Sequence, residues 1–363
     1  MSVVHVAVDA HNLARDDRGI GRYARAVLSR AVHHPGYRWT FVVRDLIPKR
    51  AAVARALGAD EVRVARRIPR DADVVWFPWN GTFLRTDVPA VATVHDAAPF
   101  AFPARDARLR ATEQNPFLAT ANTARRILVQ SRFTADEVER WLGVDAARIV
   151  VTPLAVDAVF SPAHRTSRAR EDTASEQAVT SDLATAEPQL PSEVRGKKYV
   201  LHVGAHDERK NTGTLIDAFA RAFPDGDVAL AFTRKPPSLP RGGIVVDARD
   251  DAALAALYRG AALVAVPSTY EGFGFPLLEA MACGTATLAA RAGSLPEVGG
   301  DAAAWVGEAH DLDAWAHSLR SLLDDDAARA DLAARGLARA AEFSWERCTA
   351  QTLAVLGEVA ALP

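Results

Sequence analysis

The stretch STYEGFGFPLLEAMACGTATLAARAGSLPEV, residues 268–298, decides how the rest of this sequence is interpreted. It follows the apolar run Leu263–Val266, which is typical of a buried parallel strand. A loop with two glycines comes next, and Pro276 suits the first turn of a helix because its missing N–H costs nothing there. Gly284 is placed to end that helix, and TATLAA resumes as a strand. The stretch therefore predicts the order strand, glycine-bearing loop, helix, strand.

The beginning of this helix suits a phosphate group, because a helix N-terminus presents unpaired N–H groups and the positive end of the helix dipole. The proline cannot donate, so the useful amide groups are those of Gly274, Phe275 and Leu277. Two carboxylates flank this terminus, Glu271 in the loop and Glu279 about one turn inside the helix. An acid in the first turn is also favourable for the dipole alone, so Glu279 has a structural interpretation beside a ligand-binding one.

The segment from Glu271 to Glu279, with GFGFPLL between the two acids and AMACG after them, resembles the E-x7-E signature of the family 4, or group 1, retaining glycosyltransferases. The resemblance implies the GT-B fold, in which two Rossmann-like, doubly wound parallel sheets face a central cleft. It also implies that Glu271 is a catalytic residue that binds the transferred sugar, and that Glu279 binds the ribose of a nucleotide-diphosphate sugar. The donor-binding loop would then consist of Gly272, Phe273, Gly274, Phe275, Pro276 and Leu277.

The length of 363 residues exceeds one ordinary core and predicts two domains. Strand and helix patterns alternate along both halves, which favours parallel sheets of the α/β class. We expect an acceptor-binding domain over residues 1–160 and a nucleotide-sugar-binding domain over residues 198–344. Residues 161–197 are polar, aperiodic and almost free of aromatic side chains, which predicts a linker with a mobile insertion. The resemblance implies that the helical tail, residues 345–363, packs back on the first domain.

The composition argues against several classes of protein. The net charge of −2 gives no sign of nucleic-acid binding. The two cysteines, Cys283 and Cys348, indicate neither a disulfide framework nor a zinc site. No run approaches about 18 apolar residues, and no basic region precedes the apolar run at the N-terminus. We therefore expect a cytoplasmic protein without a membrane span or a signal peptide.

The charge is unevenly distributed along the chain. Residues 1–160 hold 23 Lys and Arg against 17 Asp and Glu, whereas the remainder holds 20 against 28. The excess of positive charge is densest in Arg44–Arg70. A solvated face is the simpler interpretation, and a surface that meets an anionic lipid or an anionic acceptor is the alternative. Peripheral contact of this segment with the inner face of the plasma membrane is therefore an alternative hypothesis.

The triplet Arg209-Lys210-Asn211 follows the strand pattern YVLHVG and precedes a helix. Strand carboxyl ends in open sheets face the ligand crevice, where two adjacent cations can neutralise a departing diphosphate. Alone, the pair would be interpreted as surface charge. Beside the E-x7-E pattern, it resembles the phosphate-binding RKN of the family. The resemblance implies that Arg209 and Lys210 are catalytic and that Asn211 binds the donor.

His95 and Asp96 end a buried strand pattern of the first half. By themselves they could be a capping pair in a loop. Their place and the flanking sequence HDAAPF resemble the family's histidine site. The resemblance implies that His95 contacts the transferred sugar near its anomeric carbon, from the face opposite the leaving group, and that Asp96 binds the donor.

The segment GIGRYA, residues 19–24, resembles the glycine loop of the family's first domain, which lies under the donor diphosphate. Gly19 and Gly21 would permit close approach of the backbone to phosphate. The same letters match the GxGxxA form of a dinucleotide fingerprint, and Asp45 ends the next strand, so an NAD-dependent dehydrogenase is an alternative. The spacing is against it, because eight residues separate Ala10, where the strand pattern ends, from Gly19.

Metal-dependent glycosyltransferases use an Asp-x-Asp that follows a strand. This chain has D-A-D at 71–73, D-G-D at 225–227 and D-L-D at 311–313. The first two precede strand patterns, and the last precedes a helix, where Asp is a common cap. We expect none of them to bind a metal, and no cofactor beyond the nucleotide sugar as co-substrate.

These observations predict a retaining, metal-independent glycosyltransferase that moves a hexose or deoxyhexose from a nucleotide-diphosphate sugar to a glycan or lipid-linked saccharide. The resemblance implies bacterial surface polysaccharide synthesis, with the donor phosphate itself as base for the acceptor hydroxyl. Mannose or rhamnose, and GDP as the nucleotide, are working hypotheses. A GT-B nucleotide-sugar epimerase or phosphorylase, and a non-catalytic nucleotide-sugar binder, stay open as alternatives.

Two features near the site are less informative. In AFTRKPPSLP, residues 231–240, Arg234 and Lys235 stand where the family usually has a glycine-rich turn, which leaves the donor base undetermined. In AGSLPEV, Ser294 and Glu297 resemble the family's next loop, and we assign them loop and helix-capping roles only.

Overall fold

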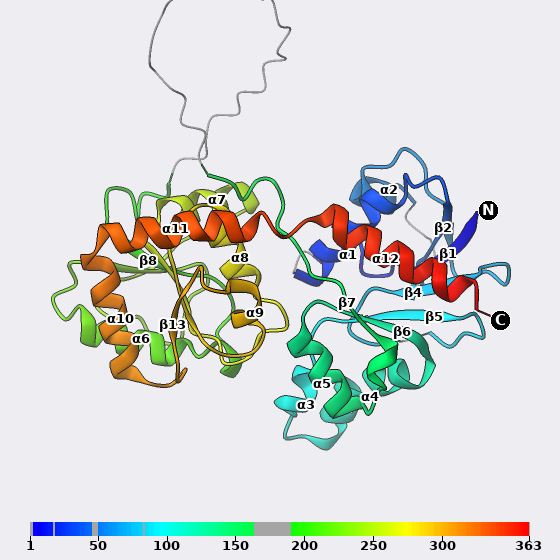
Figure 1. Ribbon diagram of the computed structural model, residues 1–363, viewed down its shortest axis with the longest axis horizontal. Helices are drawn as coiled ribbons and strands as arrows, with labels where there is room; N and C mark the ends of the chain where they lie inside the picture. Colours follow the sequence, from blue (N-terminus) through cyan, green and yellow to red (C-terminus); the bar gives the residue numbers. More distant parts are fainter. Residues whose placement is uncertain (1–2, 17–18, 46–49, 83, 163–189, 363) are drawn as a thin grey trace, which may run out of the picture.

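The computed structural model describes residues 3–16, 19–45, 50–82, 84–162 and 190–362. The chain forms two domains, each built around a single parallel sheet with helices on both faces (Figure 1). This arrangement confirms the expected α/β fold class with two doubly wound sheets.

The sheet of the first domain has seven parallel strands in the order β3-β2-β1-β4-β5-β6-β7. The strands are β1 Val4–Asp9, β2 Tyr37–Val42, β3 Val64–Ala65, β4 Val74–Phe77, β5 Ala90–Val94, β6 Ala124–Val129 and β7 Ile149–Val151. The helices are α1 Gly19–Ala31, α2 Arg50–Leu57, α3 Ala98–Ala101, α4 Ala107–Thr123 and α5 Arg132–Leu142. The strand order reverses between β1 and β4, and such a switch point is where open sheets bind ligands.

The second sheet repeats this topology with six parallel strands in the order β10-β9-β8-β11-β12-β13. The strands are β8 Tyr199–His202, β9 Ala229–Phe232, β10 Gly243–Val245, β11 Leu263–Val266, β12 Thr287–Ala290 and β13 Ala304–Val306. The helices are α6 Thr212–Ala222, α7 Asp251–Gly260, α8 Phe275–Ala282, α9 Leu295–Gly299, α10 Leu312–Asp324 and α11 Asp326–Ala340. The switch point of this sheet lies between β8 and β11.

Central strands are apolar along their whole length because helices cover both faces of each sheet. Every residue of β4 and of β11 is buried. Trp76 in the first domain and Trp315 in the second are the largest fully buried side chains. Each domain therefore has a core of its own, which holds the carboxyl ends of its strands in place.

The last helix, α12 Trp345–Ala360, leaves the second domain and packs along the first (Figure 1). Leu356 and Val359 on this helix are fully buried. Tyr37 Oη donates to Leu353 O at 2.7 Å, and Arg126 forms an ion pair with Glu358. The chain thus crosses between the domains twice, once in each direction.

The structure differs from the sequence-based expectation mainly at short elements. Strand β6 begins at Ala124, directly after α4, rather than at residue 127. Helices α3 and α9 and the 3-10 helix Glu208–Lys210 were not expected, because such short pieces contain too few residues for a hydrophobic period. Residues 163–189 of the expected insertion lie outside the described residues, whereas Val194, just after them, is buried.

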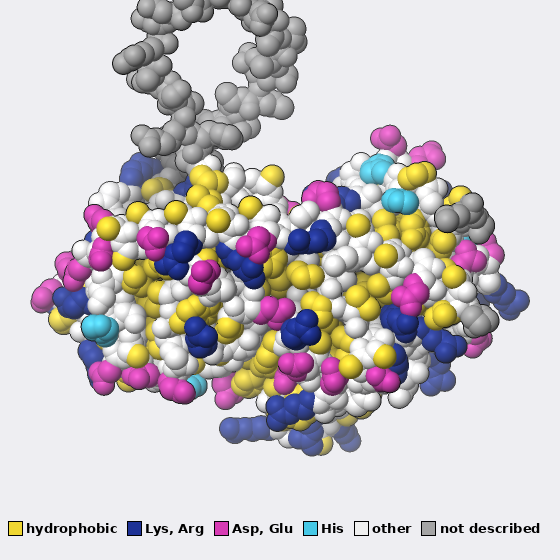
Figure 2. Space-filling view, in the orientation of Figure 1, with side chains coloured by type: hydrophobic (Ala, Val, Ile, Leu, Met, Phe, Trp, Pro, Cys, Tyr) yellow, Lys and Arg dark blue, Asp and Glu magenta, His cyan; other side chains and the backbone are white. Residues whose placement is uncertain are grey.

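The visible surface carries both signs of charge. On the face shown in Figure 2, acidic and basic side chains are interspersed over both domains, and Lys and Arg gather at the end of the first domain that carries α3 and α4. None of the helices in the described ranges combines the length and the apolar character needed to cross a bilayer.

Candidate active site

A cavity of about 1590 Å³ lies between the carboxyl ends of the two sheets. Its wall includes residues from the segments that follow β1, β5 and β6 in the first domain and β8, β9, β10 and β11 in the second. Strands at both switch points thus contribute to it, as expected for an α/β ligand site. A single small-molecule site is about 300–1,000 Å³, so this cavity has room for a donor and an acceptor together.

Most of the residues that the sequence indicates do line this cavity. They are Gly19, His95, Asp96, Arg209, Lys210, Glu271, Gly272, Phe273, Gly274, Phe275, Pro276 and Glu279. They come from four separate segments of the chain, and the fold brings them to one place.

Gly21, Asn211 and Leu277 do not belong to the cavity wall. A Cβ on Gly21 would lie 1.7 Å from Asp16 O, so this glycine is needed for packing beneath the site. Asn211 has a left-handed φ of 49°, and its Nδ2 donates to Pro267 O at 3.2 Å and Ala309 O at 2.7 Å. The N–H of Leu277 donates to Gly274 O at 3.1 Å. These positions do not agree with direct donor contacts, and we interpret the three residues as supports of the wall.

The glycine segment of the first domain also bears on the dehydrogenase alternative. Strand β1 ends at Asp9, and α1 begins only at Gly19. A dinucleotide fingerprint needs a tight turn between strand and helix. The separation seen here is therefore unlike a dinucleotide site.

Lys210 and Glu271 form an ion pair in the cavity wall, with Nζ 2.6 Å from Oε1. Their side chains are 17% and 13% exposed. Lys210 follows β8 and Glu271 follows β11, so the switch point of the second sheet brings them together. Arg209 lies beside them, with Nη2 2.9 Å from Asp207 Oδ2 and Nη1 3.9 Å from Asp96 Oδ2. Two cations thus share the cavity wall with the first residues of α8.

The loop before α8 touches the first domain directly. Gly274 adopts a φ of 97° and starts the helix. A Cβ on Gly272 would lie only 2.0 Å from His95 O. The carbonyl of Gly272 accepts hydrogen bonds from Ser131 Oγ at 2.7 Å and Thr134 Oγ1 at 3.0 Å. The two domains therefore meet at this loop, at one side of the cavity.

His95 lies at the carboxyl end of β5 and is a neutral imidazole with a defined tautomer. Its Nε2 lies 2.8 Å from Pro78 O, and it must donate because a carbonyl oxygen can only accept. Burial lowers the pKa of His95 to about 4, so the ring carries one proton near neutral pH. Nδ1 is then an acceptor, which suits a sugar hydroxyl.

Ser294 and Glu297 have roles that differ from simple capping of their own helix. Ser294 occupies the N-cap position of α9, but its hydroxyl donates to Glu271 O at 2.9 Å and so holds the loop that carries Glu271. The carboxylate of Glu297 accepts from the N–H of Arg132 at 2.8 Å and of Phe133 at 3.3 Å. Glu297 therefore caps α5 of the other domain, a contact that no local pattern predicts.

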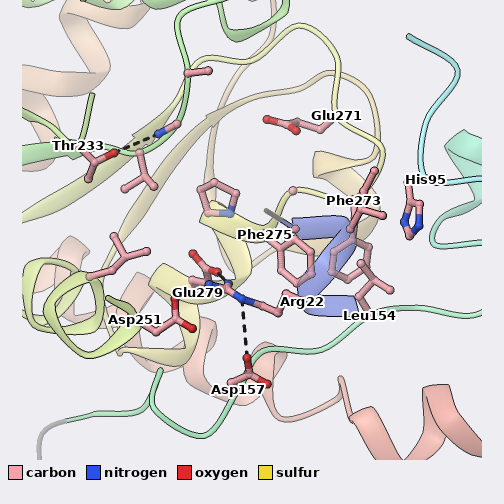
Figure 3. Close-up of a pocket in the computed structure, with 18 of the residues that line it drawn as sticks. Arg22, His95, Leu154, Asp157, Thr233, Asp251, Glu271, Phe273, Phe275 and Glu279 are labelled. Carbon is pink, nitrogen blue, oxygen red and sulfur yellow. Dashed lines mark hydrogen bonds and ion pairs between the residues drawn. The ribbon is translucent and has the colours of Figure 1, made fainter. Parts of the chain in front are cut away.

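Arg22 is the main site residue to which sequence analysis assigned no role. Figure 3 shows it reaching from α1 toward Glu279, Asp251 and Asp157. It forms ion pairs with all three carboxylates, and its guanidinium lies over the ring of Phe275 at 5.8 Å from the centroid. Asp251 and Glu279 are 229 and 257 residues away in the chain, so the contacts have no local signal.

Glu279 is held from two sides. Its Oε2 accepts from Tyr258 Oη at 2.8 Å, and its Oε1 accepts from Arg22 Nη1. Burial raises the pKa of Glu279 above its ordinary value, and Arg22 and Tyr258 oppose that shift. Glu279 thus combines a buried position with an ionic partner from the other domain.

Two of the three Asp-x-Asp pairs have structural partners. Asp73 Oδ2 accepts from the N–H of His5 at 2.7 Å, and Asp311 caps α10 by accepting from the N–H of Ala314 at 2.9 Å. In the parts of the chain that the structure describes, no group of three or more His, Cys, Asp and Glu residues could hold a metal ion.

Comparison with known proteins agrees with this geometry. The family model described as Glycosyltransferase Family 4 matches residues 4–160, and the one described as Glycosyl transferases group 1 matches residues 242–339. An O-antigen chain mannosyltransferase B from Escherichia coli is 33% identical over 285 residues, which cover 73% of this chain and 69% of that protein.

Solved structures show the same fold. Sucrose-phosphate synthase from Thermosynechococcus elongatus has a TM-score of 0.70 at 20% identity, over 98% of both chains. Anabaena Alr3699/HepE, in complex with UDP and glucose, has a TM-score of 0.66 at 15% identity, over 98% of this chain and 100% of that chain. The chain therefore belongs to the group 1 glycosyltransferases of family 4, which have the GT-B fold.

Proposed function

We propose that this glycosyltransferase transfers a hexose or deoxyhexose, with retention at the anomeric carbon, from a nucleotide-diphosphate sugar to a glycan or lipid-linked saccharide. The observation that supports the proposal is the cluster of charged side chains at the switch point of the second sheet, between β8 and β11. There the ion pair of Lys210 and Glu271, with Arg209 beside it, shares one cavity with the first residues of α8 and with the neutral His95.

The charges in this group suit departure of a diphosphate. Negative charge develops on the leaving group during transfer, and fixed positive groups that already point at it supply the largest catalytic term. Arg209, Lys210 and the N–H groups of Gly274 and Phe275 are the groups available for this role. Lys210 is already oriented by Glu271, so its ammonium need not reorganise when the donor arrives.

The sugar is proposed to lie between the two domains. Glu271 would accept hydrogen bonds from its hydroxyls, and Nδ1 of His95 would accept another from the opposite side. Asp96, whose Oδ1 accepts from the N–H of Ala98 at 3.1 Å, lies beside His95 in the wall. In this arrangement the donor phosphate acts as base for the acceptor hydroxyl, and no metal ion is required.

The donor is proposed to be GDP-mannose. The Escherichia coli relative named above is a mannosyltransferase, which supports mannose as the sugar. HepE forms a complex with UDP and glucose, so UDP is the nucleotide to compare with GDP. Thr233 and Arg234 of the unusual turn after β9 line the cavity, and Thr233 Oγ1 accepts from the N–H of Gly204 at 3.3 Å (Figure 3). We propose that this turn contacts the base of the nucleotide.

The pathway and location are part of the same proposal. A glycan or lipid-linked acceptor fits synthesis of a bacterial surface polysaccharide, at the cytoplasmic face of the membrane. Peripheral contact through Arg44–Arg70 would bring the first domain to such an acceptor.

The first test is a thermal-shift panel with GDP, UDP, GDP-mannose, UDP-glucose and NAD, each with Mg²⁺ and with EDTA. A ligand of the native state raises the midpoint by mass action. We expect a shift with one nucleoside diphosphate that does not depend on Mg²⁺ and that becomes smaller in Lys210→Ala. Lys197→Ala, which removes an exposed lysine outside the cavity wall, is the matched control.

Transfer is then measured with that donor and a mannose-containing oligosaccharide, and the anomer formed is assigned by NMR. Loss of one fixed charge-stabilising group typically lowers kcat by about 10²–10³-fold, which is the effect expected for Lys210→Ala. An inverted product, or dependence on Mg²⁺, would contradict the mechanism proposed here. Interconversion of the free nucleotide sugar, or its cleavage by phosphate, would instead identify an epimerase or a phosphorylase.

A further inference from the structure

The carboxylate proposed to bind the donor ribose is already occupied by groups of the protein. Both oxygens of Glu279 accept hydrogen bonds, Oε2 from Tyr258 and Oε1 from Arg22. The Glu279 side chain is 4% exposed although it belongs to the cavity wall. A ribose therefore cannot reach this carboxylate until a covering group moves.

Arg22 is the partner of Glu279 on the cavity side. Tyr258 is fully buried, so it holds the carboxylate from the protein side. Arg22 is 17% exposed and lines the cavity, so its guanidinium lies on the side from which a ligand comes. Hydroxyl groups of a ribose and N–H groups of a guanidinium are both donors, and both suit the same carboxylate oxygen.

We propose that Arg22 occupies the position of the ribose hydroxyls at Glu279 in the unliganded enzyme, and that donor binding exchanges its guanidinium for these hydroxyls. This inference rests on the proposed function, which assigns Glu279 to the ribose. It makes Arg22 a positioning residue that sets how much binding energy the ribose contributes.

The surroundings of Arg22 make such an exchange physically reasonable. Removing a buried ion from its only partner is costly. Arg22 has two further carboxylates, Asp251 and Asp157, which are 46% and 36% exposed and stay within its reach when it leaves Glu279. The guanidinium carries five N–H donors, so it can keep these contacts while giving up one. The exchange therefore leaves Arg22 paired with Asp251 and Asp157, while Glu279 keeps the hydroxyl of Tyr258 and gains ribose hydroxyls as donors in place of the guanidinium.

The exchange also couples the ribose to the arrangement of the domains. Arg22 belongs to α1 of the first domain, whereas Glu279 and Asp251 belong to α8 and α7 of the second. Release of Glu279 removes one of the contacts that join the domains on this side of the cavity. The contacts of Gly272 on the other side do not involve Arg22.

The test is a comparison of the ribose contribution in two proteins by isothermal titration calorimetry. Wild type and Arg22→Ala are each titrated with GDP and 2′,3′-dideoxy-GDP, and with UDP and 2′,3′-dideoxy-UDP. The dideoxy nucleotides cannot donate to Glu279 and so do not compete with Arg22. The preference for the ribonucleotide is the dissociation constant of the dideoxy nucleotide divided by that of the ribonucleotide. Competition from Arg22 lowers the apparent affinity of the ribonucleotide in wild type, in proportion to the population that must rearrange. This preference should therefore be at least about tenfold larger in Arg22→Ala than in wild type.

Two further variants serve as an intermediate case and as a control for the ribonucleotide preference. Arg22→Lys keeps the charge but cannot bridge three carboxylates, and it should give an intermediate preference. Arg126→Ala removes an ion pair between α12 and β6, outside the cavity wall, and should leave the preference at the wild-type value.

Glu279→Gln separates failure of this inference from failure of the proposed function. Loss of the ribose preference in Glu279→Gln, together with an equal preference in wild type and Arg22→Ala, would overturn the exchange while keeping the ribose role of Glu279. An unchanged preference in Glu279→Gln would overturn both. Weaker binding of GDP or UDP to Arg22→Ala, with no gain in ribose preference, would instead make Arg22 a direct diphosphate ligand and reject the exchange.

Discussion

Gly272 shows how a missing side chain lets the loop that carries Glu271 lie against the first domain. A Cβ at this position would lie 2.0 Å from His95 O and 3.1 Å from Asp96 Cβ. In Gly272→Ala the loop must therefore move away from the first domain and take Glu271 with it. Overpacking of this kind costs about 1–3 kcal/mol, and a displacement of about 1 Å at a reacting group can cost about 10²-fold in rate. We expect kcat/KM for sugar transfer to fall by about that factor.

The matched control for this substitution is Gly213→Ala. Gly213 lies in the first turn of α6, and a Cβ there meets nothing within 4 Å. Replacing a helical glycine by alanine should stabilise the protein by about 0.5–1 kcal/mol and leave transfer unchanged. Urea unfolding and steady-state kinetics on both variants make the comparison. Full activity in Gly272→Ala would show that the loop functions without contact with His95.

At the scale of elements, β8 and α6 are joined by a buried histidine that titrates. His202 at the end of β8 is 2% exposed, and its Nδ1 and Nε2 lie 3.2 Å from Ala265 O and 3.3 Å from Thr212 Oγ1. Burial lowers the pKa of His202 to about 4 from an unfolded value of 6.5. Between these values the unfolded chain takes up the proton more readily than the folded protein does.

The free energy of unfolding should therefore fall as the pH falls from 6.5 to 4, and this group should have no effect above pH 6.5. A shift of this size corresponds to about 3 kcal/mol. Urea unfolding of wild type and His202→Gln across this range measures the effect as the difference between their pH slopes. The exposed His317→Gln should keep the wild-type slope. Equal slopes in wild type and His202→Gln would rule out His202 as the titrating group.

The elements that could be predicted are those whose signal is local. The apolar run Leu263–Val266 and the glycine at 284 correctly indicated a strand and the end of α8, since Gly284 adopts a φ of 72° just after the helix. The short α9 carried too few residues for a pattern. Asn211 has a left-handed backbone, and its amide donates to Pro267 O and Ala309 O, which are far from it in the sequence and could not be predicted as its partners.

At the scale of the whole molecule, two groups of contacts around the cavity help to join the domains. One is the set of carboxylates around Arg22, and the other consists of Gly272 against His95 with Glu297 on α5. The residues proposed to bind the donor stand in short motifs, so sequence could indicate them. The residues that join the domains are single side chains far apart in the chain, and only the fold brings them together.

The basic segment Arg44–Arg70 offers a test of how the whole molecule meets its acceptor. Arg44, Arg63, Arg66 and Arg67 line a groove of about 720 Å³ on the first domain. Each basic residue near an anionic bilayer contributes about 1 kcal/mol, so reversing three of them should weaken binding to phosphatidylglycerol vesicles by at least about 100-fold. Co-sedimentation of wild type and the triple variant Arg63→Glu, Arg66→Glu, Arg67→Glu measures this effect, which salt should also diminish.

The comparison variant changes the net charge by the same amount, at other positions of the first domain. Arg85, Arg105 and Arg108 are exposed, and the last two flank the beginning of α4, at the end of the domain where Figure 2 shows Lys and Arg gathered. Reversing these three should leave vesicle binding near the wild-type level if the groove is the contact. Equal losses in both triples would attribute binding to net charge alone. Loss only in the second triple would place the membrane contact at α4, where Leu109 is 51% exposed among these arginines.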